Sequence, residues 1–261
     1  MLEASDGTLR FTATDMELAI VEGTAAEIIR VGATTTPAHT LYDIVRKLPE
    51  GAQIELALGG ENARLTLKAG RSEFTLPCLP REDFPVMADG DLPTCFSLDA
   101  GELRRLIDKT RFAVSTEETR YYLNGIYLHA AETNGVAMLR VVATDGHRLA
   151  LVETPLPEGA ANMPGVIVPR KAISELRKLI DDTEGDIIVS LSDTKVRFEF
   201  GDALLSSKLI DGTFPEYQRV IPEGNDKVLG VDAKAFAEAV DRVSTISTEK
   251  SRSVKLNLSQ G

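Results

Sequence analysis

The chain has no tryptophan and only two cysteines among its 261 residues. Cys78 and Cys95 form neither a metal-ligand spacing nor a disulfide framework, so we expect two buried thiols in a reducing cytoplasm. No apolar run reaches the roughly 20 residues that a membrane-spanning helix requires. These absences exclude a membrane span and a disulfide-stapled scaffold, and they favour a soluble globular protein.

The usual signatures of catalysis are also missing. The sequence has no P-loop, no Gly-rich dinucleotide loop and no nucleophile motif. His39, His129 and His147 lack the spacing of metal ligands, so we expect neither a metal nor a cofactor. Asp145 and His147 are the one pair that could act in general acid–base chemistry, so a hydrolase stays open as an alternative.

Positive charge is scarce overall, with a net charge of −11. A bulk charge of this sign argues against a nucleic-acid partner. Four segments with helical periodicity nevertheless sum to +6, which leaves −17 for the rest of the chain. The basic residues of any one helix could simply form its solvent-exposed face. Together they favour a surface that contacts phosphates without reading sequence, and the scarcity of aromatic residues favours duplex over single-stranded DNA.

One offset relates distant parts of the chain and marks an internal repeat of about 130 residues. Four pairs of landmarks carry it: Leu9–Asp15 and Leu139–Asp145, Phe84-Pro85 and Phe214-Pro215, Pro37 and Pro169, Ser115–Arg120 and Ser247–Arg252. A repeat of this size is a domain. It predicts a first domain over 1–93 that lacks its beginning, a complete domain over 94–226 and a truncated third over 227–261, as expected of a fragment of a three-repeat protein.

Local patterns predict an α+β fold in which two helices per repeat lie on antiparallel sheets. Apolar stripes predict helices over 41–48, 102–111, 170–180 and 234–243, with Phe112 extending the second stripe less regularly. Asp99 and Asp232 occupy N-cap positions, and Pro37 and Pro169 lie near helix starts. Alternating runs over 64–76, 187–191 and 196–200 predict strands.

The Thr-Asp pair is shared by both copies of the repeat, at Thr14-Asp15 and at Thr144-Asp145. A shared pair indicates a turn in which the Asp side chain binds backbone N–H groups. The first copy continues with Met16-Glu17-Leu18 and the second with Gly146-His147-Arg148-Leu149. We interpret Gly-His-Arg as an insertion that makes a binding site, rather than a catalytic one, in the second repeat alone.

Four strings in the same order resemble the bacterial sliding clamps, the beta subunits of DNA polymerase III: Arg120–Gly125, Ala143–Ala150, Ile167–Lys171 and Asp211–Val220. Gly70-Arg71-Ser72 with Phe84-Pro85 resembles the first domain of that family. The resemblance implies three similar domains per subunit and two subunits in a ring around duplex DNA. The helices would line the central hole, and the protein would be a non-catalytic processivity factor.

The resemblance also implies two sets of site residues. The cleft that docks polymerase, loader and repair proteins by short apolar peptides would use Leu123, Thr144, Gly146, His147, Arg148, Leu149, Pro215, Arg219 and Val220. Arginines rimming an apolar floor would concentrate the binding energy. The DNA-facing residues would be Arg170, Lys171, Arg104, Arg105 and Lys109, followed by Tyr121 and Tyr122.

The partners implied are double-stranded DNA, the polymerase III alpha subunit, the clamp loader, other proteins with a clamp-binding motif and a second copy of the subunit. The family's C-terminal tail completes the cleft, and its first and third domains form the ring interface. We therefore expect the chain alone neither to close a ring nor to bind peptide at full strength. A purely structural repeat protein is the remaining alternative, and retention on circular but not linear DNA would exclude it.

Overall fold

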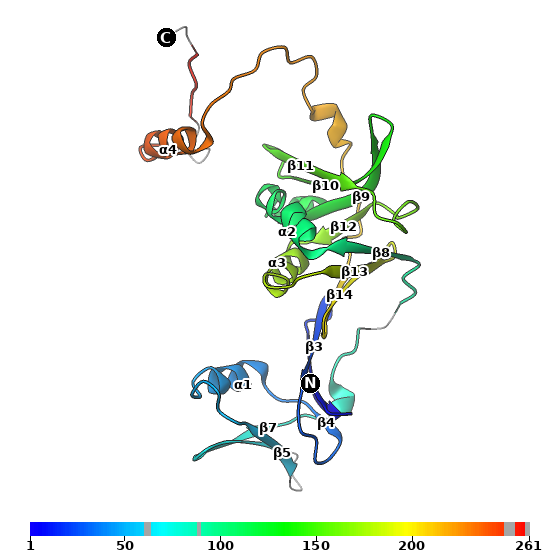
Figure 1. The fold of residues 1–261 in the computed structure, drawn as a ribbon, viewed down its shortest axis with the longest axis vertical. Coiled ribbons are helices and arrows are strands. Elements are labelled where there is room, and N and C mark those ends of the chain that lie inside the picture. The colour runs from blue at the N-terminus through cyan, green and yellow to red at the C-terminus, as the bar shows by residue number, and fades with distance from the viewer. Residues whose placement is uncertain (60–63, 88–89, 248–253, 259–261) are drawn as a thin grey trace. The chain divides into compact units, whose positions relative to one another are not determined.

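The computed structural model describes residues 1–59, 64–87, 90–247 and 254–258. The chain divides into two compact units, Met1–Phe214 and Pro215–Gly261 (Figure 1). Thr248 to Arg252, part of the last repeat landmark, lie outside the described residues. Within the described ranges, no helix is long and apolar enough to cross a membrane.

An eight-stranded antiparallel sheet runs through the first unit. Its order is β4 (Gly32–Thr34), β1 (Leu2–Ser5), β2 (Thr8–Thr14), β3 (Leu18–Ala25), β15 (Ala203–Lys208), β14 (Lys195–Phe200), β13 (Asp186–Leu191) and β8 (Thr94–Asp99). The first repeat supplies β1 to β4 and the second supplies the other four. Ala19 of β3 pairs with Ser206 of β15, so main-chain hydrogen bonds join the two repeats.

Two smaller antiparallel sheets complete the first unit. One has the order β11 (Leu149–Pro155), β10 (Val136–Thr144), β9 (Gly125–Thr133) and β12 (Val166–Pro169), and the other is β5 (Glu55–Gly59), β6 (Arg64–Ala69) and β7 (Ser72–Pro77). Gly125 begins β9 where a β-carbon would lie 2.3 Å from the Val168 carbonyl oxygen. Only glycine allows β9 and β12 to approach this closely.

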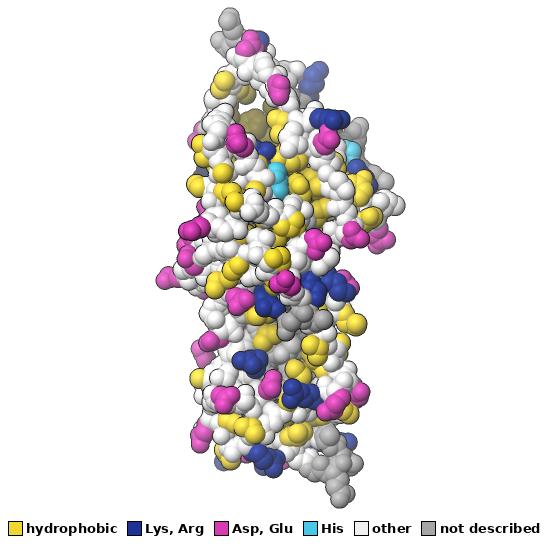
Figure 2. Space-filling model, turned by 90° about the vertical axis from the view of Figure 1, so that its right-hand side faces the viewer, with side chains coloured by type: hydrophobic (Ala, Val, Ile, Leu, Met, Phe, Trp, Pro, Cys, Tyr) yellow, Lys and Arg dark blue, Asp and Glu magenta, His cyan; other side chains and the backbone are white. Residues whose placement is uncertain are grey.

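The helices of the first unit are α1 (Ala38–Val45), α2 (Ala100–Asp108) and α3 (Arg170–Leu179), with short 3₁₀ turns η1 (Arg81–Asp83), η2 (Arg111–Ala113) and η3 (Glu118–Leu123). In Figure 1, α1, α2 and α3 lie on the same side of the unit. The opposite side, shown in Figure 2, carries basic, acidic and apolar side chains interspersed. The helices therefore share a face as predicted, while the side turned away from them is not uniformly acidic.

The second repeat is itself built from two halves that exchange a strand. β8, α2 and β9 to β11 form one half, and β12, α3 and β13 to β15 form the other. β8 pairs with β13 of the other half, and β12 pairs with β9 of the first. The four-stranded sheet thus contains three strands of the first half and one of the second, and the second repeat's part of the eight-stranded sheet contains three strands of the second half and one of the first, so neither half can bury its apolar face alone.

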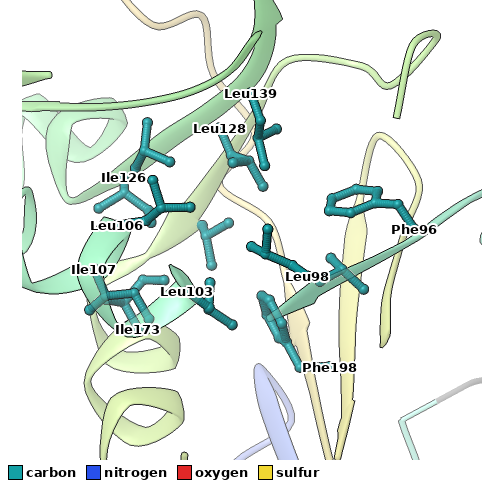
Figure 3. A pocket seen from close by; sticks show the side chains of 13 residues that line it. Phe96, Leu98, Leu103, Leu106, Ile107, Ile126, Leu128, Leu139, Ile173 and Phe198 are labelled. Carbon is teal, nitrogen blue, oxygen red and sulfur yellow. The ribbon is translucent and has the colours of Figure 1, made fainter. Parts of the chain in front are cut away.

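The core of the second repeat lies between its two sheets and two helices. Figure 3 shows side chains from β8, α2, β9, β10, α3 and β14 pointing toward one another, among them Leu106, Leu139 and Phe198. The space they leave is about 20 Å³ and lined by apolar residues, and such a space stays dry. Each of these three side chains is at most 3% exposed. The repeated α+β architecture is confirmed.

The first repeat is much less well packed in this chain. Its buried cluster consists of Leu2, Leu65 and Leu76 with partly buried neighbours. α1 contains no buried residue. The apolar stripe of α1 therefore lacks the cover that the stripes of α2 and α3 have.

The predicted caps and strands are confirmed at several places. Asp99 accepts a hydrogen bond from the Glu102 N–H at 2.9 Å, and Asp232 accepts one from Ala235 N–H at 2.8 Å. The alternating runs form β13 and β14, which pair and bury every second side chain. In the second unit, η4 (Tyr217–Val220) precedes α4 (Ala233–Ser244).

Two details of the sequence interpretation are wrong. Phe112 does not continue the stripe of α2, because that helix ends at Asp108 and Phe112 lies in η2 with 55% of its surface exposed. The cysteines are not buried either, since Cys95 is exposed and Cys78 is half-buried. Cys95 occupies an outward position of β8, between the inward-facing Thr94 and Phe96.

Candidate peptide-binding cleft and DNA-facing residues

The turn from Thr144 to Arg148 is held by its own side chains. The Thr144 hydroxyl donates to the Arg148 carbonyl oxygen at 2.7 Å and accepts from the Gly146 N–H at 3.1 Å. Asp145 Oδ1 accepts from the N–H groups of His147 and Arg148 at 2.9 and 3.0 Å. Burial opposes ionisation of Asp145, but these bonds outweigh it and lower the pKa of the carboxyl group.

The first repeat contains the same turn. Thr14 donates to the Leu18 carbonyl oxygen at 2.8 Å and accepts from the Met16 N–H at 3.0 Å. Asp15 accepts from the N–H groups of Glu17 and Leu18 at 2.9 and 2.7 Å. The predicted turn role of Thr-Asp is therefore confirmed in both copies.

The predicted Gly-His-Arg insertion is wrong. Thr14 pairs with Ala19 across the first hairpin, and Thr144 pairs with Leu149 across the second. Both turns therefore have the same length, and Gly146 stands where the first copy has Met16. The two residues share a positive φ, 74° for Met16 and 87° for Gly146. The two turns therefore differ by substitution and not by insertion.

Arg148 projects from this turn between an acid and an aromatic ring. Its Nε lies 3.0 Å from Asp145 Oδ2, and its guanidinium lies over the Phe112 ring, 5.6 Å from the centroid. A cation over an aromatic face is attracted by the ring quadrupole. The sequence did not predict this contact, because Phe112 was assigned to the apolar stripe of a helix.

The Arg120 side chain lies close to Gly146 of this turn. Its Nε donates to Glu117 Oε2 at 2.8 Å, and a β-carbon added at Gly146 would lie 2.6 Å from its Nη1. The glycine therefore provides both the positive φ and room for the guanidinium. Arg120 begins the Arg120–Gly125 string, yet it was not among the residues predicted for the cleft.

The apolar residues predicted for the cleft have mixed exposure. Leu123 is 4% exposed, and Leu149 is half-buried at the start of β11. Pro215, Arg219 and Val220 belong to the second unit, in which Arg219 forms an ion pair with Glu216 and Val220 is 69% exposed. The structure thus places Thr144 to Leu149 in one turn and at the start of β11, Leu123 at the end of η3, and the other three residues in the second unit.

The predicted DNA-facing cations differ in their partners. Arg170 at the start of α3 and Lys109 at the end of α2 are exposed, with no ion pair among the described residues. Arg105 pairs with Glu102 at 2.6 Å. Arg104 Nη1 instead donates to the carbonyl oxygens of Ile180 and Thr183 at 2.6 and 2.7 Å. Arg104 therefore ties α2 to the end of α3, a structural role that the sequence did not indicate.

Lys171 is engaged at the junction between the repeats, where it forms an ion pair with Asp15. Lys208 of β15 pairs similarly with Glu17 at 2.8 Å. The hydrogen bond from Lys171 and those from the Leu18 and Glu17 N–H groups lower the pKa of Asp15 to about 2. Asp15 in turn raises the pKa of Lys171.

The two predicted tyrosines lie in η3, just before the buried Leu123. Their rings meet edge to face, with centroids 5.8 Å apart and an interplanar angle of 78°. Tyr121 is 54% exposed, so it is available to a partner, whereas Tyr122 is half-buried.

The fold defines a class of protein built from repeated α+β domains, with the same Thr-Asp turn in the first and second repeats. Three family descriptions match consecutive parts of the chain: the N-terminal, central and C-terminal domains of the DNA polymerase III beta subunit, over residues 1–88, 97–216 and 218–261. The chain belongs to this family, the beta sliding clamps. Its members are non-catalytic processivity factors of the replicative DNA polymerase, so it is not a hydrolase.

Relatives across the family support this. The beta sliding clamp of Caulobacter vibrioides is 56% identical over all 261 residues, which cover 70% of that protein, and the Escherichia coli K12 clamp is 40% identical with 69% covered. A crystal structure of the C. crescentus clamp, with polyethylene glycol bound at a region described as tethering the beta-motif, superposes with a TM-score of 0.93 at 56% identity. That match covers 96% of this chain and 66% of the other.

A second solved structure is the Bartonella birtlesii clamp bound to griselimycin, with a TM-score of 0.91 and 50% identity. It covers 95% of this chain and 66% of the other. The chain thus spans slightly less than two thirds of these solved clamps. Over the part it shares with them, its backbone follows the clamp fold closely.

Proposed function

We propose that the chain forms the greater part of a subunit of a ring that encircles duplex DNA in the cytoplasm and keeps the replicative polymerase on its template. The observation that carries this is the continuous sheet through β3 and β15, with the helices of both repeats on one side. Repetition of such a junction curves the chain while the helices stay inside. The division into domains over 1–93, 94–226 and 227–261 belongs to the same proposal.

Retention on circular DNA tests the ring. The 261 residues replace the matching segment of the C. vibrioides clamp, and the hybrid is loaded onto a nicked circular plasmid by the Caulobacter clamp loader. We expect the hybrid to co-elute with the plasmid in gel filtration and to be lost after a single restriction cut. Loss from both forms, or retention on both, contradicts topological binding.

We also propose that the predicted cleft docks the polymerase alpha subunit, the clamp loader and other clients through short apolar peptides. Leu123 and Leu149, with Pro215 and Val220, supply its apolar surface. Thr144 and Gly146 hold the turn from which His147 and Arg148 project, and Arg219 adds a second guanidinium. The self-bonded turn supports this role, because it holds Arg148 and Leu149 in place before a ligand arrives.

Griselimycin is the probe, since a clamp that is 50% identical was solved bound to it, and we propose that it occupies the cleft of this chain. We expect calorimetry of the hybrid clamp to show binding that Leu149→Asp weakens at least tenfold, because a carboxylate would be buried against an apolar ligand. The matched control is Leu151→Asp, a half-buried leucine of the same strand two residues away. Equal losses in both variants would show that the cleft lies elsewhere.

For DNA, we propose that Arg170 and Lys109 are the principal contacts, with Lys171, Arg105, Tyr121 and Tyr122 contributing and Arg104 acting through its position. A cation without an ion pair is readily available to a phosphate, and its binding releases the counterions condensed on the DNA. Each such contact steepens the dependence of log K on log salt by about 0.9. We expect Arg170→Gln to reduce this slope for duplex DNA. Glu199→Gln on β14 serves as a charge-changing control away from the helices.

A further inference from the structure

Phe112 is a large apolar side chain that a rigid part of the backbone holds at the surface. Its turn η2 follows shortly after α2, and 55% of the Phe112 surface is exposed. The residues around it are anchored, because Thr110 and Ala113 are fully buried. The Thr110 hydroxyl also donates to the Leu106 carbonyl oxygen of α2 at 2.7 Å. The position of the ring is therefore fixed, although burial of the ring itself contributes little stability.

The Phe112 ring faces a cation from a distant part of the chain. The Arg148 guanidinium lies over it, 5.6 Å from the centroid, and the two residues are 36 positions apart. A second contact of this kind, with the same distance, joins Arg46 to Tyr42 at α1. Residues four positions apart meet by helix geometry alone. The Phe112–Arg148 contact instead requires the fold to bring η2 to the turn between β10 and β11.

The Arg148 guanidinium is held on two sides and open on the rest. Its Nε donates to Asp145 Oδ2 at 3.0 Å, and the Phe112 ring lies against one face. Among the described residues, neither Nη atom has a hydrogen-bond partner, and 58% of the side chain is exposed. A guanidinium is planar, so fixing Nε and one face also fixes the direction of the remaining N–H donors. Such donors suit a carbonyl or carboxylate oxygen of a ligand.

We propose that Phe112 is a positioning residue for peptide binding, because it fixes the Arg148 guanidinium before a client arrives. Phe112 acts through Arg148 and not by touching the client. The proposal rests on the proposed function of the cleft, in which Arg148 is one of the docking residues. A side chain that is already ordered in the free protein loses less conformational entropy on binding, so the ring raises the affinity for the client.

Calorimetry of griselimycin binding to the hybrid clamp tests this effect on affinity. Phe112→Leu keeps an apolar side chain but removes the aromatic face, and we expect about threefold weaker binding. Phe112→Tyr keeps the face and should bind like the unsubstituted hybrid. The matched control is Tyr42→Leu, which removes the equivalent contact from α1 and should leave the affinity unchanged. Equal affinities in Phe112→Leu and Tyr42→Leu would overturn the proposal.

A double-mutant cycle separates positioning from direct contact with the ligand. In the Arg148→Leu background, Phe112→Leu should cause no further loss of griselimycin affinity. A further threefold loss in that background would show that Phe112 acts without Arg148, which contradicts the proposal.

Nuclear magnetic resonance of the 261-residue chain tests the positioning without a ligand. Relaxation of the ¹⁵N-labelled Arg148 Nε–H group should report a more mobile side chain in Phe112→Leu and an unchanged one in Phe112→Tyr. Unchanged relaxation in Phe112→Leu would overturn the proposal. If the unsubstituted hybrid fails to bind griselimycin, the assignment of the cleft is wrong, and the relaxation still decides whether Phe112 positions Arg148.

Discussion

The turns at Thr14–Leu18 and Thr144–Arg148 share one backbone and differ in what they present. Both use the Thr hydroxyl and the Asp carboxylate to bind the same four main-chain groups. The last residue of the first turn, Leu18, is buried in the core of the next repeat. Its counterpart Arg148 is exposed above the Phe112 ring. The backbone of the turn is the same in both repeats, and the residue at its end is buried in one and exposed in the other.

The ion pairs around the two turns follow the same division. Asp15 and Glu17 of the first turn pair with Lys171 and Lys208 of the second repeat, and so hold the two repeats together. Asp145 of the second turn pairs within its own turn, with Arg148. The first turn therefore links the two repeats, whereas the ion pair of the second turn lies within that turn.

The largest expected effect comes from exchanging the end residues. Leu18→Arg places a guanidinium in an apolar core without a partner, which should cost about 3 kcal/mol or more of unfolding free energy. Arg148→Leu changes an exposed site and should stay within about 0.5 kcal/mol. Urea unfolding followed by circular dichroism measures both. If Leu18→Arg costs no more than Arg148→Leu, the two turns do not differ as the structure indicates.

Smaller effects on the unfolding free energy are expected from the reciprocal substitutions at Met16 and Gly146, and the two should differ in sign. A non-glycine residue at positive φ costs about 1 kcal/mol, so Gly146→Met should destabilise the chain and Met16→Gly should be neutral or slightly stabilising. Gly146→Met also meets Arg120 Nη1, and adding Arg120→Ala should recover part of the loss. Thermal unfolding of Gly146→Met, Arg120→Ala and the double variant gives the coupling energy between the two positions. A coupling energy of zero would place Arg120 away from the turn in solution.

The smallest effect should be the pH dependence of the stability that the Asp15–Lys171 ion pair contributes. The pKa of Asp15 is lowered to about 2 in the folded chain. Its stabilising contribution is therefore present above the unfolded pKa near 4 and is lost as the pH falls toward 2. In Asp15→Asn, the unfolding free energy should depend less on pH in this window. Lys171→Met should have the same effect, because it removes the cation that lowers the pKa of Asp15. A pH dependence unchanged in both variants would mean that the pair does not form.

Much of the fold could be predicted because it depends on neighbours in the sequence. Asp99 and Asp232 cap helices by bonding an N–H three residues later, and the Thr-Asp turns close over five residues. The alternation of β13 and β14 is equally local. Each of these follows from a short-range rule, so the residues alone were sufficient.

The candidate site was only partly predictable. The resemblance named His147, Arg148 and Leu149, whereas Phe112 and Arg120 were missed as partners of their turn. Arg104 was expected at a DNA surface, but it binds carbonyl oxygens 76 and 79 residues away. No periodicity reveals which of two exposed-looking arginines will reach a distant helix end.

The sequence by itself determined the repeat, the turn chemistry, the helix starts and the α+β class of this protein, because these depend on local hydrogen bonding and on apolar spacing. Only the tertiary structure decided that β3 and β15 join two repeats in one sheet and that Leu18 enters the neighbouring core. The physical reason is that side-chain packing and strand pairing between residues almost 200 positions apart are set by the collapsed chain as a whole.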